Sequence, residues 1–199
     1  MLKYKTRQIL TVAVVLIVIA IAIAALVSIA RVMFFTNNSA NNTQNNASQQ
    51  SLIDTSANRA IVMSVRGPVV SNEKFKSYQV KISPSLRVLN VYSGYDNKVE
   101  KNVTLQNNKS AYEQLVFALN KANLMRGNEL TGADNDTRGV CANGELYSFS
   151  ILNADKSEKT LWTSTCGNAK GSLDGNLVTL RDLFIGQFPE DNSVIRNLF

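Results

Sequence analysis

The sequence contains no histidine, and this absence removes several classes of chemistry. Its 199 residues also include only two cysteines, three prolines and one tryptophan. Histidine is the commonest general base near neutral pH and the commonest metal ligand, and a catalytic cysteine needs a histidine partner. A cysteine–histidine nucleophile and a histidine-bound metal are therefore excluded. No phosphate-binding loop or dinucleotide fingerprint is present, so we expect no cofactor.

An apolar run covers residues 9–30 and is broken only by Thr11 and Ser28. Its 22 positions, at ~1.5 Å of rise per residue, cross the ~30 Å hydrocarbon core of a bilayer as one helix. Small residues at positions 28 and 30 also suit cleavage after Ala30, but a cleavable signal peptide usually has an apolar core of only about 7–15 residues. We therefore predict an uncleaved transmembrane signal anchor within residues 1–35, and cleavage after Ala30 is the alternative.

Positive charge is distributed unevenly about this run. Arg31 alone follows it, whereas three basic residues precede it: Lys3, Lys5 and Arg7. The more basic flank of a membrane helix stays in the cytoplasm. The pattern thus predicts a single-pass protein of the cell membrane, with a cytoplasmic N-terminus and an outward-facing C-terminal part.

Residues 36–58 differ in composition from the segments on either side. The stretch 36–51 contains six asparagines and three glutamines and carries no charge. Such a segment has too little apolar surface to offset the entropy lost on ordering. We expect a flexible Asn/Gln/Ser linker over 36–58, followed by one extracytoplasmic domain over 59–199.

The formal net charge of +6 belongs mostly to the anchor. Elsewhere, residues 59–109 hold nine basic and three acidic side chains, whereas residues 110–199 hold eight basic and eleven acidic ones. The basic half suits lipid headgroups or an anionic wall polymer. No basic run with interleaved aromatic residues is present, so nucleic acid is not an expected partner.

Short alternating or β-branched segments bounded by turns predict four consecutive strands. These segments are 60–66, 78–82, 86–92 and 99–105. Ser110 and Glu113 then have the spacing of a capping box at the start of a helix. A second hairpin within 147–166 and a helical stripe over 177–188 follow. The order ββββαββα predicts a compact α+β domain with its helices on one face of an antiparallel sheet.

Cys141 and Cys166 both fall in the outward-facing part. An even number of cysteines outside the cytoplasm is typical of disulfides. The two residues are 25 positions apart, and closing that loop stabilises the fold by roughly 3 kcal/mol in chain-entropy terms. The sequence therefore predicts one disulfide.

Residues 134–139 (DNDTRG) have the pattern of a calcium-binding loop. Positions one, three, six and twelve of such a loop match Asp134, Asp136, Gly139 and Glu145. Arg138, however, stands where an oxygen ligand belongs, and its guanidinium would repel the ion. The other interpretation is a surface loop in which the aspartates cap backbone amides and pair with Arg138. We expect no metal, with calcium at Asp134, Asp136 and Glu145 as the alternative.

Residues 71–74 (SNEK) have the S-x-x-K spacing of serine–lysine hydrolases. In those enzymes the lysine is desolvated and serves as base for the serine. The neighbouring residues here are polar, so we expect a turn in which Lys74 stays solvated. Many pairs of carboxylates exist, but the sequence singles out none with the fixed separation that glycosidases need. No catalytic residue is expected, with Ser71 and Lys74 as the alternative.

Two stretches around the cysteines, 135–141 (NDTRGVC) and 161–166 (LWTSTC), resemble a family of small membrane-anchored extracytoplasmic proteins from candidate-phyla bacteria with reduced genomes. Residues 66–68 (RGP) and 111–113 (AYE) agree with it, so the resemblance covers most of 60–180. It implies a cell-surface location and supports pairing of the two cysteines. It implies no activity.

Three functions stay open. The favoured one is a binding or scaffolding module at the cell surface that holds a surface protein or a wall polymer. The second is a cell-wall or peptide hydrolase that acts through carboxylates or through Ser71 and Lys74. The third is an envelope-complex subunit that assembles through its transmembrane helix. An enzyme is the less favoured interpretation because no catalytic arrangement stands out in the sequence.

Overall fold

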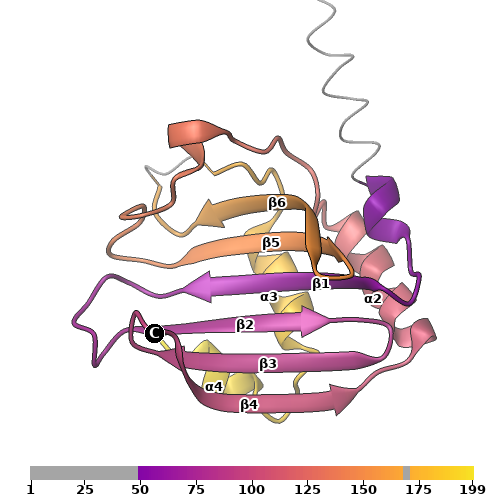
Figure 1. Ribbon diagram of the computed structural model, residues 1–199, viewed down its shortest axis with the longest axis horizontal. Coiled ribbons are helices and arrows are strands. Elements are labelled where there is room, and N and C mark those ends of the chain that lie inside the picture. Colours follow the sequence, from indigo (N-terminus) through magenta and orange to yellow (C-terminus); the bar gives the residue numbers. More distant parts are fainter. Residues whose placement is uncertain (1–48, 168–170) are drawn as a thin grey trace, which may run out of the picture. The chain divides into compact units, whose positions relative to one another are not determined.

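The computed structural model describes residues 49–167 and 171–199 (Figure 1). The expected anchor, with Lys3, Lys5 and Arg7, and most of the expected linker lie outside these residues. Within the two described ranges, no helix is both long enough and apolar enough to cross a membrane.

The described chain has an α+β fold built on one six-stranded antiparallel sheet, as the sequence predicts. The strands are β1 (Arg59–Arg66), β2 (Lys76–Ile82), β3 (Leu86–Ser93), β4 (Lys98–Gln106), β5 (Leu146–Asn153) and β6 (Lys156–Ser164). Their order across the sheet is β4-β3-β2-β1-β5-β6. The second hairpin joins the first four strands because β5 pairs with β1 along its whole length. Strand β1 therefore has a neighbour on each side.

The helices cover one face of this sheet, and α3 crosses behind its middle strands (Figure 1). They are α2 (Lys109–Lys121), α3 (Leu177–Ile185) and α4 (Asn192–Arg196). Helix α4 and a short 3-10 helix, η1 (Gly132–Asn135), are additional to the predicted elements.

The predicted capping box at the start of α2 is wrong. The N-cap is Asn108, whose side chain accepts a hydrogen bond from the backbone nitrogen of Ala111 at 2.9 Å. Asparagine caps a helix as well as serine does, and Asn108 has the extended backbone that an N-cap requires. Glu113 instead accepts a hydrogen bond from the hydroxyl of Thr55 at 3.2 Å.

The hydrophobic core lies between the helices and the inward side chains of the strands. On β1 these are Ile61, Met63 and Val65, each exposed by 2% or less. Phe149 of β5 packs on Phe184 of α3, with ring centroids 5.8 Å apart. Because successive side chains of a strand point to opposite faces, the residues between them point away from the core.

The sequence predicts that the folded domain begins at residue 59, but the folded part begins earlier in the chain. Residues 49–53 are helical, and Leu52 is only 1% exposed within the core. The Arg59 guanidinium holds this segment, because it lies 2.8 Å from Asp54 Oδ2 and 2.5 Å from Glu158 Oε2. Hydrogen bonds from the Ser56 backbone and from Arg59 lower the pKa of Asp54. The end of the expected linker is thus attached to the domain.

Leu52→Ala tests this attachment. We expect it to lower the free energy of unfolding of the full chain by about 2–3 kcal/mol, because a buried leucine loses its packing and leaves a cavity. Leu86 is 38% exposed, so Leu86→Ala is the matched control, with an expected loss below about 1 kcal/mol. Urea denaturation measures both variants, and equal losses would contradict the attachment.

Candidate binding groove on the open face of the sheet

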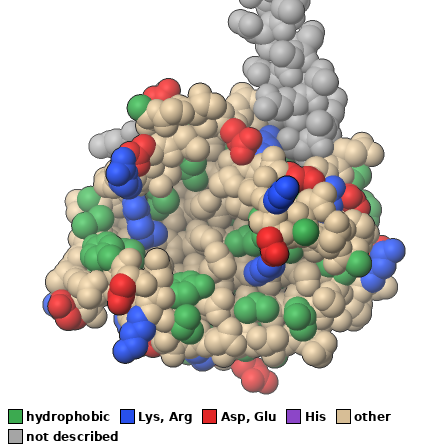
Figure 2. All heavy atoms as spheres, in the orientation of Figure 1, with side chains coloured by type: hydrophobic (Ala, Val, Ile, Leu, Met, Phe, Trp, Pro, Cys, Tyr) green, Lys and Arg blue, Asp and Glu red, His purple; other side chains and the backbone are tan. Residues whose placement is uncertain are grey.

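The face of the sheet opposite the helices is open, and its side chains are mostly small or polar. One row of outward residues crosses all six strands in register: Asn102, Asn90, Gln79, Ser64, Ser148 and Trp162. Within this row, Gln79 Nε2 donates to Ser64 Oγ at 3.1 Å, and Asn102 Nδ2 donates to Asn90 Oδ1 at 2.6 Å. No member of the row is charged. Figure 2 shows this face, with a hollow at its centre that is mostly tan, the colour of the backbone and of side chains that are neither charged nor hydrophobic.

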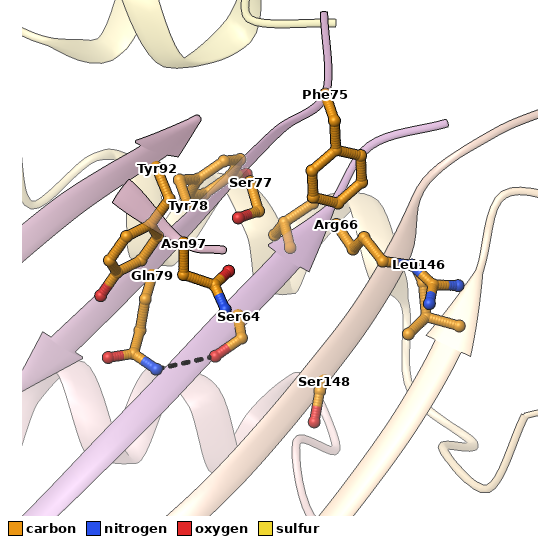
Figure 3. A pocket seen from close by; sticks show the side chains of 11 residues that line it. Ser64, Arg66, Phe75, Ser77, Tyr78, Gln79, Tyr92, Asn97, Leu146 and Ser148 are labelled. Atoms are coloured by element: carbon orange, nitrogen blue, oxygen red, sulfur yellow. Dashed lines mark hydrogen bonds between the residues drawn. The ribbon is translucent and has the colours of Figure 1, made fainter. Parts of the chain in front are cut away.

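A groove of about 410 Å³ lies on this face over β5, β1, β2 and β3. Hydroxyl and carboxamide groups make up its floor: Ser64, Ser77, Gln79, Asn97 and Ser148. Figure 3 shows Tyr92 on the same side as Asn97 and Gln79, with Phe75 and Leu146 on the other side. The volume falls within the ~300–1,000 Å³ that is typical of small-ligand sites. Of the described residues in the lining, only Arg66 is charged, and apolar surface from the aromatic and aliphatic side chains exceeds the polar surface.

One wall of the groove is aromatic and is fixed by its own contacts. The ring of Tyr95 stacks on Phe75 with centroids 4.0 Å apart. Its hydroxyl donates to the carbonyl of Val70 at 2.8 Å, and its backbone nitrogen donates to Asn72 Oδ1 at 2.9 Å. Gly94 begins this turn with φ +71°, and a Cβ there would lie 2.4 Å from a side-chain oxygen of Asp96. The β3–β4 turn is therefore held against residues 67–75.

Apolar side chains on this wall remain exposed to solvent. Val69, Tyr95 and Val99 are 49%, 48% and 55% exposed. Val99 lies opposite Tyr92 in the ladder between β3 and β4, so this surface adjoins the groove. Clustered exposed apolar groups of this kind are typical of interaction surfaces.

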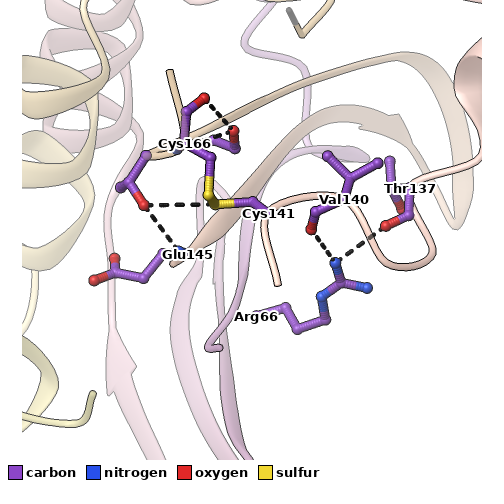
Figure 4. Close-up of a disulfide and its surroundings, with 8 residues drawn as sticks. Arg66, Thr137, Val140, Cys141, Glu145 and Cys166 are labelled. Atoms are coloured by element: carbon purple, nitrogen blue, oxygen red, sulfur yellow. Dashed lines mark hydrogen bonds between the residues drawn. A yellow bond between two sulfur atoms is a disulfide. The ribbon is translucent and has the colours of Figure 1, made fainter. Parts of the chain in front are cut away.

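The disulfide loop, residues 136–145, leads from η1 to β5 and is attached to Arg66, which lines the groove. Arg66 Nη2 donates to the carbonyl oxygens of Thr137 and Val140 at 3.0 and 2.9 Å (Figure 4). Cys141 is bonded to Cys166, with Cα atoms 5.3 Å apart, so the predicted disulfide is confirmed. The Nε of Arg66 is buried without a hydrogen-bond partner in the described part of the chain. Arg66 thus supports the loop through Nη2 and keeps its positive charge beside the groove.

The three carboxylates of the calcium pattern are not brought together. Asp136 binds Arg138, whose Nε lies 2.9 Å from Oδ1, and this hydrogen bonding lowers the pKa of Asp136 to about 2. Asp134 is exposed in η1, and Glu145 accepts a hydrogen bond from the Tyr147 hydroxyl. Among the residues that the structure describes, no group of three or more acidic or cysteine side chains could hold a metal ion. The local pairing of Asp136 with Arg138 is the one expected of a surface loop.

Ser71 and Lys74 lie in one turn ahead of β2, and both side chains are exposed. The backbone nitrogens of Lys74 and Phe75 both donate to the carbonyl of Ser71 at 3.0 Å. This turn positions the Phe75 ring in the aromatic wall. It does not provide the desolvated lysine that a serine–lysine hydrolase requires.

The structure also shows two polar sites that no sequence motif indicates. A cavity of about 210 Å³ on the helix side is lined by Tyr78, Tyr147, Arg181 and Arg196, and burial raises the pKa of both tyrosines. Lys159 is 5% exposed, and its Nζ donates to two carbonyls of the segment after α2 at 3.1 and 3.0 Å. Burial lowers the pKa of Lys159. Its position two residues before Leu161, which points into the core, is the one sequence signal that indicates it.

Arg66→Met tests the support of the disulfide loop. Methionine keeps much of the side-chain volume but loses both hydrogen bonds to the loop. We expect trypsin to cleave after Arg138, which is 90% exposed, roughly tenfold faster than in the parent chain. Arg126→Met, which removes an exposed ion pair with Asp174, is the control and should leave this cleavage rate unchanged. Mass spectrometry of the nicked chain under non-reducing conditions follows the cut. An unchanged rate in Arg66→Met would show that Arg66 does not hold the loop.

No protein-family model matches this chain, and no curated protein matches its sequence. The chemistry of the site itself is therefore the basis for its function. In the described residues, that site is a groove with hydroxyl and carboxamide groups on its floor, aromatic side chains in its lining and Arg66 as its one charged group.

Proposed function

We propose that this chain is a binding or scaffolding module of the cell surface, held at the membrane by residues 9–30 and presenting its groove to a ligand outside the cell. The observation that carries the proposal is the groove, with its hydroxyl and carboxamide floor, its aromatic lining and the exposed apolar side chains near it. Concave polar surface beside exposed apolar groups is typical of recognition sites. The disulfide supports an oxidising compartment, and the uneven charge about residues 9–30 supports export of the domain.

Binding fits these side chains better than hydrolysis does. A hydrolase needs an acid, a base or a nucleophile beside the bond that breaks. The described residues that line the groove include no carboxylate and no lysine. Ser71 and Lys74, the pair with hydrolase spacing, are exposed in a turn. An envelope subunit that assembles through its membrane helix would use residues outside the described ranges, and no described residue favours it.

The proposed location predicts opposite labelling at the two ends of the chain. In intact cells, a membrane-impermeant maleimide should label Ser157→Cys, which is exposed on β6, and should not label Lys5→Cys until the cells are lysed. Cys141 and Cys166 should react only after a reductant is added. Labelling of Lys5→Cys in intact cells, or of both native cysteines without reductant, would refute the proposed topology.

The proposed binding surface predicts cross-linking from the groove alone. A photoreactive phenylalanine analogue in place of Gln79 should form adducts with a partner in living cells. The same analogue in place of Phe117, which is 50% exposed on α2, reports on the helix side of the sheet. Adducts at position 79 but not at 117 would support the proposal, and their absence at 79, or equal yields at both positions, would contradict it.

A further inference from the structure

The floor of the groove offers hydrogen-bonding groups that the protein does not use. In the part of the chain that the structure describes, the side chains of Ser77, Asn97 and Ser148 make no hydrogen bond with protein. Gln79 uses one N–H on Ser64, which leaves its carbonyl oxygen and its second N–H free. Hydroxyl and carboxamide groups both donate and accept hydrogen bonds. The floor therefore matches a ligand that carries many hydroxyl groups.

The backbone of the floor is not available to a ligand. Strands β1, β2, β3 and β5 each have a neighbour on both sides, so their N–H and C=O groups pair within the sheet. An extended peptide bound there would leave its own backbone groups to be satisfied by scattered side chains, and unpaired backbone groups are unfavourable when buried. A chain of sugar rings has no such backbone requirement.

Aromatic rings provide the other surface that a sugar ring needs. Tyr92 lines the groove on one side and Phe75, on which Tyr95 stacks, lines it on the other. The C–H face of a pyranose ring is apolar, and it stacks on an aromatic face while the hydroxyls at the ring edge reach polar side chains. Tyr92 lies on the same side of the groove as Gln79 and Asn97, which gives one ligand both contacts (Figure 3).

The charge of the groove indicates whether a neutral or an anionic oligosaccharide fits it better. Among the described residues, Arg66 is the only charged one in the lining, and two backbone carbonyls occupy its Nη2. One partly buried cation cannot compensate the several charges that an anionic chain would bring into the groove. We therefore infer that the groove binds a neutral oligosaccharide chain, with Tyr92 as the stacking surface and Gln79 as a hydrogen-bonding contact. This inference rests on the proposed binding function and names its ligand class.

Calorimetric titration of the full chain in lipid nanodiscs, free of sugar-based detergents, tests the inference. The neutral probes are hexasaccharides of β-1,4-linked glucose, N-acetylglucosamine and mannose, and the anionic probe is hexagalacturonate. We expect at least one neutral probe to bind, with an affinity that changes little with salt. Gln79→Met and Tyr92→Leu should each weaken that binding about tenfold.

Matched variants separate the site from general damage. Gln106→Met and Phe117→Leu alter exposed residues outside the groove and should leave binding unchanged. Tyr92→Phe keeps the ring and should retain most of the affinity, which guards against loss of folding in Tyr92→Leu. Binding that survives both Gln79→Met and Tyr92→Leu would overturn the inference.

The remaining outcomes distinguish this inference from the function on which it rests. Failure of all three neutral probes at about 5 mM, or stronger and salt-sensitive binding of hexagalacturonate, would overturn the carbohydrate assignment. If the photoreactive residue at position 79 still captures a partner, the binding function is supported and only the carbohydrate assignment is wrong. If position 79 also captures nothing, the binding function and the carbohydrate assignment are both wrong.

Discussion

The positions of the core and of the groove depend on how the side chains of the central strand β1 alternate between the two faces of the sheet. Its neighbours β2 and β5 pair with it on both sides, so only its side chains decide which face joins the core. Ile61, Met63 and Val65 point to the helices and are almost fully buried, whereas Ser64 and Arg66 point to the other face. A sheet can leave one face in water only if the outward residues tolerate it. The open face, and hence the groove, follows from this alternation.

The aromatic wall of the groove and the disulfide loop are fastened to neighbouring points of the same sheet. Arg66 ends β1 and holds the disulfide loop, while Phe75 immediately precedes β2 and carries the ring of Tyr95. The bond between Cys141 and Cys166 ties the same loop to the end of β6. These parts are therefore held in place by contacts within the chain, and a ligand of the proposed kind would spend little binding energy on ordering them.

Local patterns in the sequence predicted the local parts of this structure. Alternation marked the strands, and the two cysteines marked the disulfide, because each signal is contained in a short segment or a simple count. The helix start was missed because Asn108 and Ser110 are both good caps, and the choice between them depends on how the chain leaves β4. Leu52 was assigned to the linker because one leucine barely alters the composition of a polar stretch. The groove could not be predicted, since it requires the pairing of β1 with β5 and the register of Gln79 beside Ser64.

Residues that stabilise the fold and residues that would contact a ligand lie on opposite faces of the sheet. Gln79 and Ser148 lie on the outward face and make no contribution to the core, so substitutions there change the chemistry of the floor at little expense in stability. Arg66 and Cys141 are different, because both hold the disulfide loop and Arg66 also lines the groove. A fold of this kind can keep its sheet while the floor of the groove changes, since the floor presents side chains alone and its backbone is fully engaged in the sheet. The selective contacts of the proposed binding site would consequently belong to the face whose residues fold formation constrains least.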